Sequence, residues 1–188
     1  MLEVRPTGIS GLVILATKWH EDDRGAFSET YQQSRFQAAG IDISFIQDNQ
    51  AFSKKAGTLR GLHCQVPPAA QSKLVRVTRG SIYDVAVDIR PGSPTYGKWA
   101  GVELSAANRL QFFVPAGFVH GYLTLEDDTD VLYKVDAPYT PQCERGVVWN
   151  DPDIGIDWPQ IGNEPVIAPR DAAMPRLADL MPTEEWRV

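Results

Sequence analysis

Hydrophobic and polar residues alternate with a period of two along most of the chain from Leu12 to Trp149. Short runs rich in Val, Ile, Phe and Tyr are separated by Gly, Pro, Asn and Asp, which is the chemistry of strands and turns. The alternation predicts strands over residues 11–19, 26–31, 45–53, 58–65, 74–79, 82–89, 98–105, 109–115, 120–126 and 130–136. Many short strands at this spacing are typical of a sandwich, jelly roll or barrel.

Residues 73–90 contain the clearest pair of predicted strands. Apolar side chains alternate over 74–77 and again over 82–89, and Arg79-Gly80 separates the two runs. Because a glycine-containing turn between two alternating runs is a hairpin signal, we expect these two strands to pair with each other.

Helical patterns are rare in the sequence. The segment QSRFQAAG, residues 33–40, predicts a short helix in which Ser34 is the N-cap and Gly40 stops the helix. Beyond Trp149 the chain is rich in Pro, Asp and Gly and loses its periodicity. This change predicts an ordered arm wrapped on the domain, with a short helix near residues 177–181.

The composition is that of one globular domain covering residues 1–188. Hydrophobic residues make up 43% and charged residues 22%, which is close to ordinary globular usage. A chain of this length can bury a sizeable core without disulfides or metals. The net charge of −6 argues against a general affinity for nucleic acid, because that affinity depends on many Lys and Arg contacts to phosphates.

Cysteine content and the first residues bear on the compartment. Cys64 and Cys143 form no CxxC pair, which favours a reducing compartment. The segment MLEVRPTGIS has neither a basic leader nor the apolar run of roughly 7–15 residues of a secretory signal. The apolar stretch GLVILA is far shorter than the roughly 20 residues that span a bilayer. We therefore expect a cytoplasmic protein with no membrane partner.

Two motifs narrow the architecture to a cupin-type jelly roll. VPAGFVHGY, residues 114–122, has the P-x-G-x-x-H spacing of the second cupin motif and includes His120, and GLHCQ takes the place of the first motif. We expect an all-β fold of two packed antiparallel sheets with a few short helices and a C-terminal arm. A metal-binding cupin presents two histidines as H-x-H, but here the second position is Gln65, a poor ligand, so we expect no metal site.

Three interpretations of His63 follow from the residues alone. The chain has only three histidines, and His63 precedes the poor ligand Gln65 by two positions. It is a metal ligand without its partner, a core histidine satisfied by hydrogen bonds, or a base. The poor ligand at position 65 disfavours the first interpretation.

Several blocks, in order along the chain, resemble the dTDP-4-dehydrorhamnose 3,5-epimerase family over roughly residues 2–180. The blocks are DDRGAFSETY, FIQDNQAFS, TLRGLHCQ, QSKLVRVTRGSIYDVAVDIR, VPAGFVHGY, LYKVDAPYTPQCERGVVWNDPDIGIDWP and APRDAAMP. The resemblance implies an isomerase of dTDP-L-rhamnose biosynthesis that inverts C3 and C5 of dTDP-4-dehydro-6-deoxy-D-glucose, giving dTDP-4-dehydro-L-rhamnose. Protons leave next to the C4 ketone and return on the opposite face, which needs no redox cofactor.

The resemblance also implies which residues react. His63 is implied as the base, with Asp171 fixing its ring, and Tyr133 as the proton donor. Lys73 is implied to stabilise negative charge at the C4 oxygen, and His120 to line the same sugar pocket.

For the nucleotide half, the resemblance implies cations at the two phosphates and a flat surface at the thymine. Arg24 and Arg60 are the implied phosphate partners, because a guanidinium fork matches phosphate oxygens, and Tyr139 is the implied stacking residue. The remaining implied contacts are Glu29, Gln47, Asn49, Glu144 and Arg170, the last at a position where relatives often carry Lys.

Two other classes of function stay open. A relative that epimerises only C3, or that isomerises the keto group, would share the scaffold, and a non-catalytic cupin would bind a sugar or nucleotide without turnover. We also expect a homodimer in which residues 2–15 add to a sheet of the partner. The resemblance implies this arrangement, and GLVILA lacks an obvious cover in so small a domain.

Overall fold

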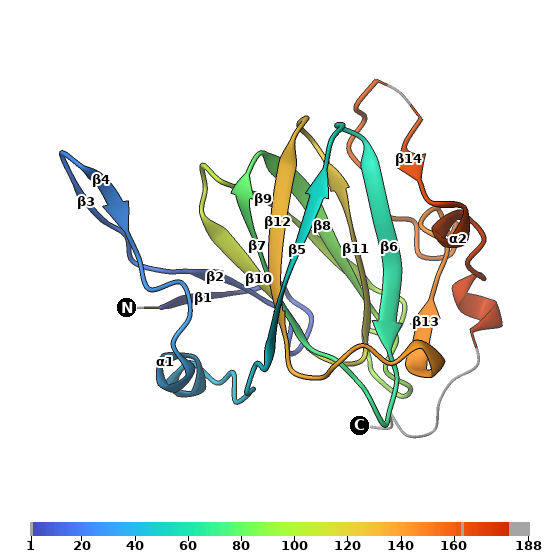
Figure 1. Cartoon of the computed structure of the whole chain (residues 1–188). Helices are drawn as coiled ribbons and strands as arrows, with labels where there is room; N and C mark the ends of the chain where they lie inside the picture. Colours follow the sequence, from blue (N-terminus) through green and yellow to red (C-terminus); the bar gives the residue numbers. More distant parts are fainter. Residues whose placement is uncertain (1, 163, 181–188) are drawn as a thin grey trace.

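Two antiparallel sheets packed face to face form the body of the protein in its computed structural model, which describes residues 2–162 and 164–180 (Figure 1). The six-stranded sheet contains, in spatial order, β1 (Glu3–Pro6), β2 (Val13–Ala16), β10 (Leu110–Val114), β7 (Lys73–Arg79), β12 (Thr129–Val135) and β5 (Gln47–Ser53). The five-stranded sheet contains β13 (Glu144–Gly146), β6 (Thr58–Gln65), β11 (Phe118–Thr124), β8 (Ser81–Asp88) and β9 (Trp99–Ser105), and the short β14 (Val166–Ile167) runs parallel to β6. The predicted all-β jelly roll is confirmed.

The expected hairpin over residues 73–90 is wrong, because β7 and β8 belong to different sheets. β7 pairs with β10 and β12, whereas β8 pairs with β11 and β9. Between them Gly80 has a φ of 73°, and a Cβ there would lie 2.3 Å from Thr129 Oγ1. The chain thus crosses between sheets at a corner that only glycine fits. Alternation in the sequence marks strands but not their partners.

The core between the sheets is built from the inward residues of both. Val75, Phe112 and Val131 from the six-stranded sheet join Ile82, Leu104 and Phe118 from the five-stranded sheet in one cluster. Each fully buried side chain of this size stabilises the fold by about 1.5–3 kcal/mol relative to exposure. The core therefore holds the two inner faces at a fixed separation, and the polar residues described below lie between the same two faces.

Segments outside the sheets cover both outer faces. The turn around α1 (Gln33–Ala38) covers the six-stranded sheet, where Phe36 and Ile41 pack with Leu15, Leu74 and Phe113. The C-terminal arm, orange to red in Figure 1, covers the other sheet, where Val147, Ile154, Trp158 and Leu177 pack with Leu59, Leu62 and Val85. The arm is ordered, as predicted, and contains α2 (Pro169–Ala172) and the 3-10 helix η2 (Leu177–Asp179).

The short helices differ in detail from the prediction. α1 begins at Gln33 after an uncapped Gln32, so Ser34 lies inside the helix and its prediction as N-cap is wrong. The helix ends before Gly40, as expected. η2 falls where a helix was predicted, although Met181 lies outside the described residues, whereas α2 and the 3-10 helix η1 (Pro141–Cys143) were not expected. No helix within residues 2–162 and 164–180 has the length and apolarity to cross a bilayer.

A separate hairpin of two strands projects from the body of the two packed sheets (Figure 1). It consists of β3 (His20–Asp22) and β4 (Gly25–Phe27), whose residues are all exposed, including Phe27 at 68%. A free two-stranded hairpin is only marginally stable in water, so this one is expected to have a cover. The expectation that GLVILA lacks a cover is wrong, because Leu12 and Leu15 of this segment are fully buried and Leu15 packs with Phe36. β2 also lies between β1 and β10, so the edge strand of the sheet is β1.

The loop that joins β8 to β9 is fixed by a buried carboxylate. Asp88 accepts hydrogen bonds from Arg90 at 2.7 and 2.9 Å and from the hydroxyls of Ser93 and Thr95, both at 2.6 Å. Burial alone would raise the pKa of Asp88, but these hydrogen bonds outweigh it and lower the pKa to about 2. Since Arg90 also stacks on the Phe118 ring at 4.6 Å, the loop is tied to the core.

Asp88→Asn should lower the free energy of unfolding at pH 7 by about 2 kcal/mol, because the ionised carboxylate is bound more tightly in the folded state. This contribution is fully present above the unfolded pKa of about 3.9 and is lost as the pH falls from there to about 2. Urea unfolding at several pH values measures it. Asp22→Asn is the matched control, since Asp22 forms the same i, i+2 pair with Arg24 but is 53% exposed, and it should leave the free energy of unfolding nearly unchanged because solvent screens the pair. Equal losses in the two variants would contradict the prediction.

Candidate active site

A cavity of about 410 Å³ opens between the two sheets and the C-terminal arm. Nine of the thirteen residues singled out in the sequence line it: Arg60, His63, Lys73, His120, Tyr133, Tyr139, Glu144, Arg170 and Asp171. They come from β6 and β11 of one sheet, from β7 and β12 of the other, and from the chain that follows β12. The fold therefore gathers side chains from distant parts of the sequence into one pocket.

An irregularity in β6 aims two of these residues into the pocket. His63 lies opposite His120, and Arg60 lies opposite Tyr122. Between these two pairs β6 therefore contains one residue more than β11 does. Without this bulge, a strand of period two would send residues 60 and 63 to opposite faces. The extra residue is accommodated at Gly61, where a Cβ would lie 2.6 Å from both Gly121 Cα and His120 O.

The bulge also connects β6 to the arm. The Gly61 N–H donates to Asp171 Oδ2 at 3.0 Å, and the same carboxylate oxygen lies 3.6 Å from His63 Nε2. Burial would raise the pKa of Asp171, but the His63 ring and the Gly61 N–H outweigh it and lower the pKa, so the group is an anion at neutral pH. A carboxylate beside one ring nitrogen orients the imidazole and leaves its other nitrogen for chemistry. His63 is 31% exposed, which disfavours the interpretation as a closed core histidine.

Lys73 and Tyr133 face this pair from the six-stranded sheet. Lys73 Nζ donates to the backbone oxygen of His63 at 3.3 Å, which holds the ammonium inside the pocket. Burial lowers the pKa of Lys73. Burial raises the pKa of Tyr133, so its phenol keeps its proton at neutral pH. A molecule in the cavity would therefore have an imidazole on one side and a phenol on the other.

Asp84 is a site residue that the sequence reasoning missed. Its Oδ1 lies 2.5 Å from His120 Nε2, both side chains are buried, and Asp84 Oδ2 has no hydrogen-bond partner within the described residues. Burial lowers the pKa of His120, and Asp84 opposes that shift. The signal in the sequence was an aspartate at an inward position of β8, between Ile82 and Ala86, where the alternation calls for an apolar residue.

Three polar residues form a chain at the mouth of the pocket. The Tyr139 hydroxyl donates to Glu144 Oε2 at 2.7 Å, and Arg170 forms an ion pair with the same oxygen. Burial would raise the pKa of Glu144, but Arg170 and Tyr139 outweigh it and lower the pKa. Arg60 lies on the other side, where its guanidinium donates to Phe52 O of the edge strand β5 at 3.1 Å. Two guanidinium groups therefore lie along the pocket wall.

Gln47 and Asn49 lie beside the pocket without lining it. They share the inner face of β5 with Ala51, which does line it, and Asn49 lies directly opposite Tyr133. Gln47 Nε2 donates to Asn49 Oδ1 at 2.8 Å, so the two amides are held together at the rim. The sequence prediction placed them in the site itself, and the structure places them next to it.

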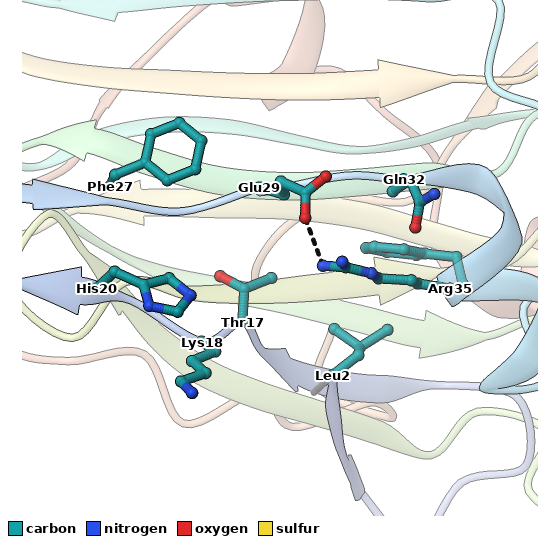
Figure 2. Close-up of a pocket in the computed structure, with 9 residues that line it drawn as sticks. Leu2, Thr17, Lys18, His20, Phe27, Glu29, Gln32 and Arg35 are labelled. Atoms are coloured by element: carbon teal, nitrogen blue, oxygen red, sulfur yellow. Dashed lines mark ion pairs between the residues drawn. The ribbon is translucent and has the colours of Figure 1, made fainter.

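Arg24 and Glu29 are not brought into the pocket of their own chain. Arg24 lies at the tip of the β3–β4 hairpin, where it pairs with Asp22 and its side chain is 90% exposed. Glu29 lines a smaller cavity of about 180 Å³ beside that hairpin, and Figure 2 shows its carboxylate facing Arg35, with which it pairs at 2.6 Å. Within one chain, the predicted contribution of these two residues to the site is therefore absent from the described structure.

Seven further residues line the pocket, and of these the sequence pointed only to Gln65, as the residue at the position of a cupin metal ligand. They are Ala51, Cys64, Gln65, Gln71, Gly121, Tyr122 and Ala168. Burial raises the pKa of Cys64 to about 12, so this thiol stays protonated at neutral pH. The Tyr122 hydroxyl is buried without a hydrogen-bond partner in the described part of the chain. The alternation alone predicts Tyr122 as an ordinary inward residue of β11.

The donor set of the pocket does not match a metal site. Gln65 occupies the position of the second histidine of metal-binding cupins, and its amide donates to Ala69 O and Pro138 O and accepts from the Thr140 N–H. Across residues 2–162 and 164–180, no three His, Cys, Asp or Glu side chains are placed to hold one ion. The arrangement instead combines an imidazole, a phenol and a half-buried ammonium group, which are the kinds of group that proton transfer next to a carbonyl requires.

Comparison with known proteins agrees with this chemistry. A family model described as dTDP-4-dehydrorhamnose 3,5-epimerase matches residues 6–179. A protein of that name from Sinorhizobium fredii is 50% identical over 159 residues, which are 85% of this chain and 81% of the relative. A structure of dTDP-6-deoxy-D-glucose-3,5-epimerase from Legionella pneumophila, in complex with dTDP-4-keto-L-rhamnose, is 42% identical with a TM-score of 0.92 and covers 96% of this chain and 95% of that chain.

A relative of different specificity is also similar. The 3'-monoepimerase from Streptomyces bikiniensis, in complex with dTDP-quinovose, is 38% identical with a TM-score of 0.84, and the match covers 92% of this chain and 87% of that chain. The family match nevertheless extends over nearly the whole chain and includes the pocket described above. The chain therefore belongs to the dTDP-4-dehydrorhamnose 3,5-epimerase family.

Proposed function

We propose that this protein inverts C3 and C5 of dTDP-4-dehydro-6-deoxy-D-glucose to give dTDP-4-dehydro-L-rhamnose. The observation that carries the proposal is the pair of opposed groups in the pocket, with His63 and its carboxylate partner Asp171 on one side and Tyr133 on the other. An inversion at carbon needs a base and an acid on opposite faces. The proposed location of this reaction is the cytoplasm, for which the support is the sparse cysteine content.

The reaction begins with removal of a proton next to the C4 ketone. The His63 imidazole takes the proton from C3 or C5, and the electron pair of the broken C–H bond moves into the enolate. Asp171, whose pKa is lowered by its neighbours, holds the ring and stabilises the imidazolium that forms. C3 and C5 are both adjacent to the ketone, which acidifies the hydrogen on each carbon, and His63 is the proposed base for both.

The enolate oxygen needs a fixed positive charge. Lys73 supplies it from within the pocket, where little water screens its ammonium. Burial lowers the pKa of Lys73, and the carboxylates of Asp84 and Glu144 oppose that shift, which favours the charged form that the enolate requires. His120, held by Asp84, lines the sugar end of the same pocket.

Return of the proton to the opposite face completes the inversion. Tyr133 donates its phenolic proton to the enolate carbon from the six-stranded sheet. The His63 imidazolium then releases its proton to solvent and the Tyr133 phenolate takes one up, which restores both groups for the next inversion. Burial raises the pKa of Tyr133, which keeps the phenol in the protonated form before each turnover.

The mouth of the pocket suits the nucleotide half of the substrate. Arg60 and Arg170 provide guanidinium groups for the two phosphates, and Tyr139 is exposed at 56%, leaving a ring face open for stacking on thymine. Glu144 orients both Tyr139 and Arg170. Gln47 and Asn49 at the rim are polar contacts for the part of the substrate that extends out of the cavity.

Substitution of the base and of the acid should have different effects in deuterated water. His63→Ala should abolish deuterium incorporation at C3 and C5 together, because neither hydrogen can be removed. Tyr133→Phe should retain exchange, at least at C3, while formation of the L-configured sugar falls by about 10²–10⁴-fold. NMR and mass spectrometry of the sugar nucleotide measure both quantities.

Several outcomes of this experiment decide between the candidate functions. Wild-type incorporation at both carbons supports the 3,5-epimerase, whereas incorporation at C3 alone supports a C3 epimerase, the activity in the name of the Streptomyces bikiniensis relative. Absence of any exchange would favour a non-catalytic cupin. If Tyr133→Phe loses exchange and inversion in equal proportion with unchanged dTDP affinity, Tyr133 positions His63 or the ketone and is not a separate acid.

Turnover should survive exhaustive treatment with EDTA and should not increase when zinc, iron or manganese is added. The reason is that Gln65, at the position of a cupin metal ligand, has its amide bonded to the backbone on both its nitrogen and its oxygen. Initial rates before and after chelation, with metal content determined by mass spectrometry, test this. A rate that falls with EDTA and returns with one of these metals would overturn the interpretation of Gln65.

The active form of the enzyme is proposed to be a homodimer. Support comes from the projecting β3–β4 hairpin, whose Phe27 is 68% exposed in the part of the chain that the structure describes, and from the edge strand β1. Arg24 lies on that hairpin, away from its own pocket. In the dimer, the hairpin brings Arg24 to the partner's phosphate site, and residues 2–15 contribute to the interface.

Mixed dimers should reveal whether Arg24 acts across the interface. Light scattering should first give about twice the 20.8 kDa of one chain. Arg24→Ala and His63→Ala homodimers should each be nearly inactive, but co-expression should restore about a quarter of the wild-type activity, since half of the dimers then hold one intact site. Arg60→Ala with His63→Ala is the matched control and should restore nothing, because Arg60 and His63 line the same pocket of one chain. No restoration with Arg24→Ala, or a monomer at micromolar concentration, would refute the proposal.

A further inference from the structure

Gln65 makes three hydrogen bonds to backbone groups of other segments. Its Nε2 donates to Ala69 O at 2.9 Å and to Pro138 O at 3.0 Å, and its Oε1 accepts from the Thr140 N–H at 2.5 Å. The residue is 4% exposed. Its role as a replaced metal ligand explains none of these contacts.

Two of the three bonds are to the residues on either side of Tyr139. The amide accepts from the residue after it and donates to the residue before it, so one side chain of β6 holds both peptide groups that flank the tyrosine. The neighbouring Gln71 donates to Ala137 O at 2.6 Å, and the Val66 N–H donates to Cys143 O at 2.8 Å. The segment 137–143 is therefore bound along its length to the last residue of β6 and to the loop that follows this strand.

Tyr139 depends on this backbone anchorage for its orientation. The ring is 56% exposed, so packing against the core does not fix it, and its only side-chain hydrogen bond within the described residues is to Glu144. An exposed ring on an untethered loop would lose conformational entropy on binding a flat ligand, and that loss weakens affinity. Fixing the loop in advance removes this cost.

Glutamine is the side chain of this length that can form all three hydrogen bonds. Two acceptors and one donor face the side chain, so it must present two N–H groups and one oxygen. Glutamate has no N–H to donate, methionine has neither group, and histidine cannot donate twice and accept once. The identity of residue 65 is thus set by the loop that it holds.

We propose that Gln65 is a positioning residue that holds Tyr139 ready to stack on the nucleotide base of the substrate. The proposal rests on the function proposed above, in which Tyr139 contacts the base. Gln65 itself acts only through the peptide groups on both sides of Tyr139. The opposite end of the substrate, where protons are transferred, lies with His63 and Tyr133 and is unaffected.

Gln65→Met tests this role, because it keeps the length and shape of the side chain and removes all three hydrogen bonds. The dissociation constant of dTDP, measured by calorimetry, and KM should each rise about tenfold, while kcat at saturating substrate stays within about twofold. In a Tyr139→Ala background, Gln65→Met should change dTDP affinity by less than about twofold, because the residue acts through that ring. Thr124→Val is the matched control, because it also removes hydrogen bonds between a buried side chain and the backbone. Thr124 Oγ1 donates to Lys55 O and accepts from the Thr58 N–H, and Thr124 does not line the pocket. This variant should leave dTDP affinity unchanged.

Three results would overturn the inference. Unchanged dTDP affinity in Gln65→Met, an equal loss of affinity in the Tyr139→Ala background, or a fall in kcat as large as the rise in KM would each show that Gln65 does not act through Tyr139. Failure of the proposed function is distinguishable, because then the wild-type protein does not bind dTDP, or Tyr139→Ala binds it as well as the wild type does.

Hydrogen exchange of the wild type keeps the inference testable if Gln65→Met fails to fold. The Thr140 amide should be protected in the ligand-free protein, because it is already bonded to Gln65 Oε1. Exchange at the rate of an open loop, with protection appearing only when dTDP is added, would show that the loop is ordered by the ligand and not by Gln65.

Discussion

The bulge at Gly61 is the constraint on which the rest of the site depends. It places Arg60 and His63 on one face of β6, although three positions separate them, and it directs the Gly61 N–H toward Asp171. The same carboxylate then lies beside His63, so one distortion of a strand aims the proposed base into the pocket and provides the group that orients it. The close approach of Gly61 and Gly121 makes this possible, because a side chain at either position would meet the backbone of the opposite strand.

The pocket separates its chemical roles between the two sheets. The five-stranded sheet carries the histidine and the arm that supports it, and the six-stranded sheet carries the lysine and the tyrosine. The core holds the sheets apart by the thickness of two layers of side chains, so in the proposed function a sugar ring lies between them with one reacting group on each face. A single sheet could not present groups to both faces of a ring, which is why the inversion chemistry needs the packed pair.

Burial serves the same chemistry. Burial raises the pKa of Tyr133, which keeps the proposed acid protonated, and it reduces the screening of the Lys73 charge by water. The cost of placing charges there is offset by partners, as in the Asp84–His120 pair and the Glu144–Arg170 pair. Gln65 has a similar role for buried backbone groups. Its amide forms hydrogen bonds to the peptide groups that flank Tyr139, which would otherwise be left without partners in a partly buried loop.

The sequence by itself determined most strands of the two sheets, the absence of βαβ alternation, and the blocks around His63, His120 and Tyr133, since alternation and short motifs are local properties of the chain. It missed the short strands β1, β3, β13 and β14, which are too brief or too polar to alternate visibly. It did not determine that β7 and β8 turn away from each other at Gly80, because pairing depends on which partners compete for each strand. The contact between Asp84 and His120 could not be predicted for the same reason, since it forms only when β11 pairs with β8. Arg24 and Glu29 were assigned to the site by motif, yet the chain's own tertiary structure carries them away from it on a projecting hairpin and its flank. Local alternation indicates which face a side chain takes within a regular strand, whereas the bulge in β6 and the neighbours across a sheet, between sheets or along an arm are set by packing over the whole chain.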